Sequence, residues 1–309
     1  MREGIEAICR NLDRNTGEFL LSREIRLGYL AEAAREAFSA ACAEGCGTLS
    51  ECFAYSAGAF LPGEVTLPAD AFPDNCRELA FSAAWLAEED RVAFSEEYLA
   101  CAERRFCRPA TLSDFPEGTR SRPPGGRILY VESPHAESAF SAFSSLLGQA
   151  EARHAPSFRE VCNGLDGGYA DYAILPLSSA DLPLVSVREL IFRYGLHIAS
   201  LCPLTAGEEG VVMALLSREA VALQTPTRFR FRFSPEESGG VAPVLSAAKN
   251  CGLSVLSFDI LPLSYEEGRR SAHATLAGES RGFVRYLAYL TLFLPGFTGY
   301  GFYSETEGG

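Results

Sequence analysis

The amino-acid sequence predicts a mixed α/β and α+β fold, with a helical N-terminal region, one α/β lobe and a C-terminal βαββαβ module. Three observations lead to this prediction. The first 108 residues carry apolar side chains at helical spacing, whereas residues 127–216 alternate short apolar strands with helices. Further on, Arg and Phe alternate from Arg228 to Phe233, with the period of two typical of a strand that has one apolar face.

The N-terminal region is expected to contain at least three helices. Ser22 is a suitable cap for a helix that runs to Gly45. Further helices are expected at Cys76–Glu88 and Ala93–Phe106, with prolines breaking the stretch before them. The side of the first helix expected to be buried holds Ile25, Tyr29, Leu30, Ala33, Ala34, Ala37, Phe38 and Ala41. The sequence assigns no role to this region.

A proline- and glycine-rich stretch is expected to separate the helical region from the rest. Residues 108–126 contain four prolines and few apolar side chains, as linkers do. We therefore expect a helical region at 1–108, a linker at 109–126, an α/β lobe at 127–222 and a C-terminal module at 223–309.

The lobe is predicted from alternating strand and helix patterns. Expected strands are Ile128–Val131, Tyr169–Pro176, His197–Leu201 and Gly210–Leu216. Expected helices are Glu137–Leu147, Phe158–Leu165 and Val187–Tyr194. Such alternation is typical of a mostly parallel sheet.

The C-terminal module follows the order strand, helix, strand, strand, helix, strand. After the Arg/Phe strand, Val241, Leu245 and Ala248 are expected on the buried side of a helix that ends before Gly252. A second helix, from Glu279 to Leu294, has an apolar face of Phe283, Leu287, Leu290 and Leu294. The remaining strands are expected at Leu253–Leu261, Ser271–Leu276 and Phe297–Tyr303. This order is the ferredoxin-like plan.

Composition excludes several classes of function. The net charge of −13 gives no general attraction for nucleic acid or for an anionic membrane. No apolar run approaches the roughly 20 residues that span a bilayer, and the N-terminus lacks a signal-peptide core. We therefore expect a cytoplasmic protein. No phosphate-binding or other cofactor motif is present, so no cofactor is expected.

Ten cysteines are present, and three of them, Cys42, Cys46 and Cys52, lie close together in the sequence. Their spacing matches no common zinc or iron–sulfur pattern. In a cytoplasmic chain they are expected as free, small apolar residues on helices, so no metal is expected. A metal site is the alternative.

The C-terminal module resembles an ACT domain, the regulatory module that binds amino acids at subunit interfaces, and most of all the one that ends prephenate dehydratases. In that family a Gly-Ala-Leu motif and a Glu-Ser-Arg-Pro motif build the phenylalanine site. Gly239-Gly240-Val241 and Asp259-Ile260-Leu261-Pro262 occupy these positions here. The resemblance makes Gly239, Gly240, Val241, Asp259 and Pro262 the effector-binding candidates. It also implies a homodimer or a larger oligomer.

Residues 127–222 resemble the first lobe of the prephenate dehydratase catalytic domain, which is of the periplasmic-binding-protein type. Gly167 to Pro176 reads Gly-Gly-Tyr-Ala-Asp-Tyr-Ala-Ile-Leu-Pro, close to the Gly-x-Ala-Asp-Tyr-Gly-Val-Val-Pro strand of that family. Together with the C-terminal module, the resemblance covers residues 127–303.

The residues that carry catalysis in this family are replaced. Ser178 and Ser179 stand where the family has Glu and Asn, and Val211 and Val212 stand where it has its catalytic Thr and Arg. Only a few residues separate Leu204 from Gly210, where the family has its entire second lobe. Catalytic residues therefore remain unknown. Ligand-binding candidates in the lobe are His135 and Glu137, expected in a loop after the first strand, with Ser178 and Ser179.

Two further polar positions have structural interpretations. A Thr-Arg-Phe sequence does occur at Thr227-Arg228-Phe229, but it begins the alternating strand, so Arg228 is expected in solvent and Phe229 in the core. Asp171, inside an apolar strand, is expected to fix neighbouring backbone rather than to take part in catalysis.

Two functional hypotheses follow. In the first, the chain is a catalytically impaired relative of prephenate dehydratase in phenylalanine metabolism, with a ligand-binding, regulatory or scaffolding role and a small anionic or amino-acid ligand. In the second, it is an active prephenate dehydratase, a carbon–oxygen lyase, in which the N-terminal region or a partner subunit supplies the second wall. The Arg/Lys/Glu pattern of the chorismate mutase domain found in some relatives is not apparent.

Overall fold

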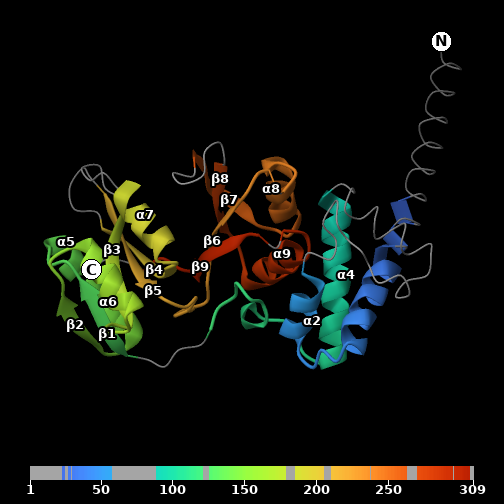
Figure 1. Ribbon diagram of the computed structural model, residues 1–309, viewed down its shortest axis with the longest axis horizontal. Coiled ribbons are helices and arrows are strands. Elements are labelled where there is room, and N and C mark those ends of the chain that lie inside the picture. Colours follow the sequence, from blue (N-terminus) through green and yellow to red (C-terminus); the bar gives the residue numbers. More distant parts are fainter. Residues whose placement is uncertain are drawn as a thin grey trace, which may run out of the picture. The chain divides into compact units, whose positions relative to one another are not determined.

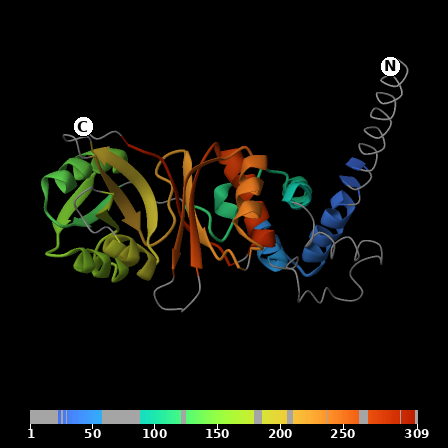
Figure 2. The ribbon, with the colours of Figure 1, turned by 90° about the horizontal axis from the view of Figure 1, so that it is seen from above.

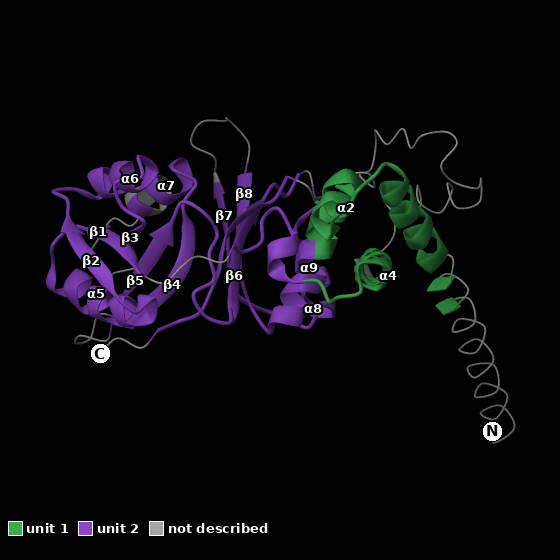
Figure 3. Ribbon diagram, turned by 90° about the horizontal axis from the view of Figure 1, so that it is seen from below, with its two compact units in different colours: residues 1–110, 288–295 green, residues 111–287, 296–309 purple. Residues whose placement is uncertain are grey.

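The computed structural model divides the chain into two compact units (Figures 1 and 3). One unit comprises residues 1–110 with 288–295, and the other comprises residues 111–287 with 296–309. The structure describes residues 23–24, 27–28, 30–57, 88–120, 125–178, 185–204, 210–236, 238–262, 270–294 and 296–306.

The helices of the first unit pack around Tyr98. Residues 30–43 are helical, α2 is Leu49–Ser56 and α4 is Glu88–Phe106. The Tyr98 ring lies 5.5 Å from that of Phe38 and 5.1 Å from that of Phe53, measured between ring centroids. Its hydroxyl donates to the Cys52 carbonyl oxygen at 2.9 Å, so the buried hydroxyl is satisfied.

The predictions for this unit are partly tested. Six of the residues expected to be buried are buried: Leu30, Ala33, Ala34, Ala37, Phe38 and Ala41. Ile25, Tyr29 and the helix expected at 76–88, except for its last residue, lie outside the described residues. The structure adds α2, which begins at a capping box: Thr48 Oγ1 accepts from the Glu51 N–H, and the Glu51 carboxylate accepts from the Thr48 N–H.

The α/β lobe of the second unit is built on a five-stranded sheet with the order β2-β1-β3-β5-β4. Its strands are β1 (Gly126–Tyr130), β2 (Ala150–His154), β3 (Tyr172–Ser178), β4 (His197–Leu204) and β5 (Val211–Ser217). Its helices are α5 (Pro134–Leu147), α6 (Phe158–Asp166) and α7 (Val185–Arg193). The strand β2 was not predicted, because its sequence, Ala-Glu-Ala-Arg-His, has no apolar alternation.

The expectation of a mostly parallel sheet needs correction. β1 pairs in parallel with β2 and β3, but β5 is antiparallel to both of its neighbours, β3 and β4. Four strands therefore point one way and β5 returns between two of them. The cause is the short connection from β4 to β5, because a few residues suffice for a hairpin but not for a crossover.

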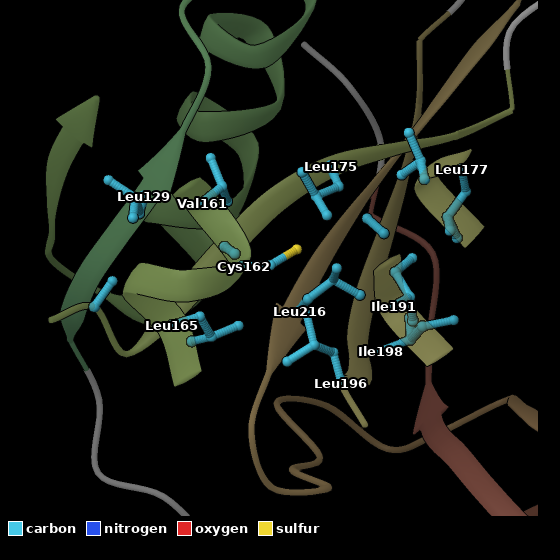
Figure 4. Packing of buried hydrophobic residues seen from close by; sticks show 14 of the residues in the cluster. Leu129, Val161, Cys162, Leu165, Leu175, Leu177, Ile191, Leu196, Ile198 and Leu216 are labelled. Atoms are coloured by element: carbon cyan, nitrogen blue, oxygen red, sulfur yellow. The ribbon is translucent and has the colours of Figure 1, made fainter. Parts of the chain in front are cut away.

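Each face of the lobe sheet is covered by helices. α6 and α7 contribute Val161, Cys162, Leu165, Val187 and Ile191 to one apolar cluster (Figure 4). On the other face, α5 contributes Ala136, Ala139, Phe143 and Leu147 to a second cluster. The lobe is thus a three-layer α/β structure, with helices on both sides of the sheet.

Part of the predicted linker is folded. Leu112–Asp114 form a 3-10 helix, the Phe115 ring is buried, and Arg120 bridges in parallel to Val221 after β5. The segment up to residue 120 therefore packs within the second unit.

The C-terminal module has a four-stranded antiparallel sheet with the order β7-β8-β6-β9. Its strands are β6 (Arg228–Phe233), β7 (Ser254–Pro262), β8 (Arg270–Ala277) and β9 (Thr298–Tyr303). Its helices are α8 (Val241–Asn250) and α9 (Ser280–Phe293). In the module's own numbering the sheet order reads 2-3-1-4, so the predicted ferredoxin-like plan is confirmed. Figure 2 shows both helices, orange to red, on one side of this sheet and the lobe, green to yellow, on the other.

The alternating strand β6 forms the centre of the module. Phe229, Phe231 and Phe233 are buried against the helices, as predicted. Arg228 is not in open solvent, because the lobe and the C-terminal segment cover that face: its guanidinium pairs with Glu305 at 2.8 Å.

The two module helices differ in how well their buried faces were predicted. In α9 all four expected residues are buried, including Phe283 and Leu287. In α8 the fully buried residues are Val244, Ala247 and Ala248, and the expected Val241 and Leu245 are half-buried at the edge. With small residues along most of its length, α8 has a weak apolar periodicity. Among the described residues, no helix is long and apolar enough to cross a membrane.

Phe231→Ala should strongly destabilise the module. The Phe231 ring is fully buried, lies between those of Phe229 and Phe233, and contacts Tyr286 edge-on at 5.8 Å. Truncation of a buried Phe costs about 3–5 kcal/mol of unfolding free energy. Urea unfolding followed by circular dichroism should show the lower midpoint, whereas the exposed Lys249→Ala should change stability by less than about 0.5 kcal/mol. An unchanged midpoint for Phe231→Ala would contradict this account of the core.

Candidate functional site

The chain order of the strands places a topological switch point in the lobe. β1 leads through α5 to β2 on one side, and β2 leads through α6 back across to β3 on the other. α5 and α6 accordingly cover opposite faces. In open α/β sheets, ligands bind outside the carboxyl ends of the strands that flank such a point. Here these strands are β1 and β3.

The segment after β1 is anchored at the start of α5. Ser133 Oγ accepts a hydrogen bond from the Ala136 N–H at 3.2 Å, and Pro134 occupies the first helical turn. His135 and Glu137 therefore lie in the first turn of α5. The predicted loop is wrong, because the Ser-Pro pair begins the helix three residues earlier than expected.

Glu137 is held beside the end of β1. The Tyr130 hydroxyl donates to Glu137 Oε1 at 3.1 Å, and the His154 ring, at the end of β2, meets the Tyr130 ring edge-on at 4.8 Å. Burial, followed by the adjacent Glu137, raises the pKa of Tyr130, so this phenol remains a hydrogen-bond donor at neutral pH. The Glu137 side chain itself is exposed. The Glu137 carboxylate, with one oxygen fixed by Tyr130, thus lies at the switch point. His135, two residues earlier in the chain, is half-buried.

The structure differs from the prediction at the two candidate serines, Ser178 and Ser179. Ser178 is the last residue of β3 and pairs with Val212 after a register shift at residues 176–178, so it is not in a loop. The irregular pairing lengthens the strand beyond Pro176. Ser179 lies outside the described residues. β1 and β3 pair only as far as Tyr130 and Ile174, four residues before Ser178, so the contribution of the two serines to a site beside Glu137 stays a prediction.

Val211 and Val212, the two valines that the sequence comparison had placed at the Thr-Arg positions, begin β5. Val211 is 8% exposed and packs with the α5 cluster, whereas Val212 packs against the cluster on the other face. Leu204 of β4 pairs directly with Val211. Neither valine carries a hydrogen-bonding group, so this part of the sheet edge is apolar.

Asp171 has the structural role expected of it. Its Oδ2 accepts from the Arg127 backbone N–H at 3.0 Å and from Arg127 Nε at 3.1 Å. Arg127 also donates to the Gly168 carbonyl oxygen at 3.1 Å. These bonds join the starts of β1 and β3, at the end of the strands opposite to Glu137.

Three of the effector-binding candidates lie at the start of α8, and the other two, Asp259 and Pro262, lie in β7. Gly239 and Gly240 have φ of +73° and +113°, which L side chains rarely adopt, so glycine is required there. Asp259 lies in β7, the strand that follows α8. The backbone of Pro262 ends β7.

A row of paired residues crosses the module sheet from Asp259. Asp259 pairs with His273 of β8, and His273 pairs with Arg232 of β6, so all three are on the face opposite to the Phe side chains of β6. His273 is buried, and its ring stacks on Phe192 of α7 at 4.8 Å. This row connects the exposed Asp259 to the lobe.

The lobe and the module meet at a seam that sequence patterns did not indicate. The Phe192 ring lies 4.7 Å from that of Tyr300 of β9, and Arg230 joins both residues in lining a small pocket. Leu177, Ile191 and Ile198 complete the lining. Only about 10 Å³ of the pocket admits the centre of a water-sized molecule, which is room for about one water. The pocket is therefore a packing feature and too small for an amino acid.

Two titratable groups flank Gly299 in this seam. Glu117 Oε2 accepts from the Gly299 N–H at 2.8 Å, and His197 hydrogen-bonds to the Gly299 backbone. Burial raises the pKa of Glu117, opposed by the Gly299 N–H, and burial lowers the pKa of His197, opposed by that bond and by Glu219. Both groups thus favour their neutral forms in the folded protein.

The described residues contain no group of three or more His, Cys, Asp or Glu side chains that could hold a metal ion.

Comparison with known proteins gives only structural similarities. No protein-family model and no curated protein matches the chain. A prephenate dehydratase from Streptococcus mutans is 16% identical, with 59% of this chain and 98% of that chain covered and a TM-score of 0.48. A prephenate dehydratase from Arthrobacter aurescens in complex with L-Phe is 11% identical, covering 58% and 90%, with a TM-score of 0.43.

A structure described as GqqA, a novel type of quorum quenching acylase, is also similar. It is 17% identical, covers 57% of this chain and 94% of that chain, and has a TM-score of 0.43. At such identities and TM-scores, these similarities assign no activity, substrate or partner to this chain.

Glu117→Gln should make the protein more stable at neutral pH. Because its pKa is raised above the ordinary value of 4.5, Glu117 favours folding below that pH, and this contribution is lost as the pH rises through the raised folded-state pKa. Glutamine can still accept from the Gly299 N–H without a buried charge. Urea midpoints should therefore differ between variant and wild type at pH 7 and converge near pH 4. Equal midpoints at pH 7 would show that the carboxylate carries no burial penalty.

Proposed function

We propose that this chain is a divergent relative of prephenate dehydratase, connected with phenylalanine metabolism, that has lost catalysis and binds an amino acid or a similar small anion. The observation that carries the proposal is the direct pairing of Leu204 with Val211. At the point where the family inserts its second lobe, β4 turns back into β5. A cleft with one wall can bind a ligand, but it leaves that ligand open to water.

The chemistry of dehydration supports the loss of activity. Elimination of carbon dioxide and hydroxide from prephenate requires a proton donor at the leaving hydroxide and cationic or hydroxyl partners for two carboxylates. At the positions of the family's Thr and Arg, Val211 and Val212 offer neither, and both pack into apolar clusters. The framework of the lobe is intact, because the bonds from Arg127 to Asp171 hold the starts of β1 and β3 together.

A zwitterionic amino acid suits the switch point. The exposed Glu137 carboxylate, positioned by Tyr130, can accept hydrogen bonds from an ammonium group. A ligand carboxylate can be bound by the side chain and the backbone N–H of His135, since Pro134 has no N–H and the Ala136 N–H donates to Ser133 Oγ. The site would thus bind both the ammonium group and the carboxylate group of an amino acid. Ser178 and Ser179 remain candidates for additional hydrogen bonds.

We further propose a homodimer formed through β7. This strand is at the edge of the module sheet, and an unpaired edge can pair with a second copy. Four large apolar side chains of this strand are exposed to solvent, at 36–49%: Val255, Leu256, Ile260 and Leu261. Two copies related by a twofold axis would pair their edges and cover these side chains at the same time.

Purified protein should form no phenylpyruvate from prephenate above the rate measured without protein. The missing donors at Val211 and Val212 are the reason. Turnover above that background would support the alternative of an active prephenate dehydratase whose second wall comes from the N-terminal region or a partner subunit.

Phenylalanine, tyrosine or tryptophan should raise the melting temperature, since a ligand that binds only the folded protein stabilises it by mass action. Glu137→Gln should abolish the shift because it removes the charge that binds the ammonium group, and Asp259→Asn should retain it. If only Asp259→Asn lost the shift, the amino acid would bind at the module and not at the lobe. No shift with any of the three would count against amino-acid binding.

Ile260→Lys should convert the dimer to a monomer. A charge on the edge strand would have to be buried between the copies, which should raise the dissociation constant at least about tenfold. Sedimentation velocity at micromolar concentration measures the change. Tyr169→Lys, which alters an exposed aromatic residue of the lobe, is the control and should remain dimeric. A wild-type monomer would refute the proposed interface.

A further inference from the structure

Three cysteines of the first unit lie together in the folded chain. Cys42 is in the helix of residues 30–43, Cys46 is in the turn that follows, and Cys52 is in α2. The Cys52 thiol is within hydrogen-bonding reach of the Cys42 and Cys46 thiols, and all three are free. The turn of residues 44–48 joins the two helices that carry Cys42 and Cys52, and both helices pack against Tyr98 of α4.

The three thiols differ in access. Cys42 and Cys46 are half-buried, whereas Cys52 is fully buried. Beside Cys52, the Tyr98 hydroxyl donates to the Cys52 carbonyl oxygen at 2.9 Å and contacts Ser56 Oγ at 2.7 Å, which fixes α2 on α4. A reagent from solvent can therefore reach Cys42 or Cys46, which we call the outer thiols. The Cys52 thiol is shielded from solvent but lies within hydrogen-bonding reach of both.

We propose that Cys42, Cys46 and Cys52 form a reversible dithiol–disulfide site in which Cys52 is the shared partner, oxidised by a low-molecular-weight disulfide such as oxidised glutathione. A single cysteine could only form a mixed disulfide, but here a second thiol is in place to displace the small molecule. The proposal is independent of the ligand site in the lobe.

The reaction proceeds in two exchanges. The thiolate of Cys42 or Cys46 attacks one sulfur of oxidised glutathione, whose sulfur–sulfur bond breaks and releases one glutathione thiolate that takes up a proton. The Cys52 thiolate then attacks the protein sulfur of the mixed disulfide and releases the second glutathione. Two protein thiols lose two electrons and two protons, and one glutathione disulfide becomes two thiols.

Burial of Cys52 makes the second exchange slow at neutral pH. Burial, followed by the neighbouring Cys42 and Cys46 thiols, raises the pKa of Cys52 to about 12, and only the thiolate attacks a disulfide. The rate of ring closure should therefore rise about tenfold per pH unit below that pKa. The mixed disulfide should accumulate at pH 7 and close rapidly at pH 9.

Digestion after glutamate separates the three thiols and so maps the product. Cleavage after Glu36, Glu44, Glu51 and Glu64 places Cys42 in peptide 37–44, Cys46 in 45–51 and Cys52 in 52–64. The folded full-length chain is incubated with oxidised glutathione at pH 9, quenched with acid and an alkylating agent, digested and analysed by mass spectrometry. We expect peptide 52–64 linked to 37–44 or to 45–51, and release of both partners by dithiothreitol.

Cysteine variants make the assignment falsifiable. Cys42→Ala and Cys46→Ala should each keep one link to peptide 52–64, and the double variant should lose both. The double variant alters half-buried positions and leaves the buried Cys52 in place, so its circular dichroism should match that of the wild type. Cys101→Ala, at a buried cysteine of α4 that contacts Glu97 and Arg104, is the control and should keep the wild-type links.

Three results would overturn the proposal: no linked peptide from the folded wild type, a link only between 37–44 and 45–51, or links to 52–64 that persist in the double variant. Each would show that Cys52 is not the shared partner of the outer thiols.

Discussion

The second unit depends on the close approach of β4 and β9, which joins the lobe to the module. Gly301 makes this possible: a Cβ at that position would lie 2.2 Å from the Ile198 carbonyl oxygen, a distance that no side chain can occupy. Past β9, the Leu201 N–H donates to the Ser304 carbonyl oxygen at 3.1 Å, and the Thr306 N–H donates to the Leu201 carbonyl oxygen at 2.7 Å. The end of the described chain thus covers the edge of the lobe sheet.

This seam also explains why the arginine face of β6 is not solvated. In an isolated module, alternating Arg and Phe would give one wet face and one apolar face. Here α7 and β4 lie against the arginine side, where Arg230 lines the pocket with Phe192 and Tyr300. An arginine can serve in such a place because its long apolar stem packs while its planar head stacks or forms hydrogen bonds. The same strand therefore contributes to two packed surfaces.

The sequence predicted the elements that have strong local signals and missed those set by distant contacts. The period of two identified β6, and the ferredoxin-like order followed from short elements with clear breaks. The strand β2 was not predicted because it is stabilised by pairing with β1 and has no apolar pattern of its own. His135 and Glu137 were assigned to the right end of the lobe but to a loop, since a Ser-Pro pair can form either a turn or a helix start. The seam had no local signal, because the residues that line its pocket come from five separate elements.

The row Asp259, His273 and Arg232 gives the module a direct physical connection to the lobe. His273 is both paired with the exposed edge residue Asp259 and stacked on Phe192 of α7, so a change in charge or position at the edge acts on a buried aromatic contact. Connection alone is not allostery, which requires an element with two arrangements that both sites bias. The element of the lobe that contacts this row is α7. It follows β3, whose end forms the proposed ligand site, and its Phe192 is the residue that touches the module. α7 therefore links the proposed ligand site physically to the module sheet, whose edge strand is β7.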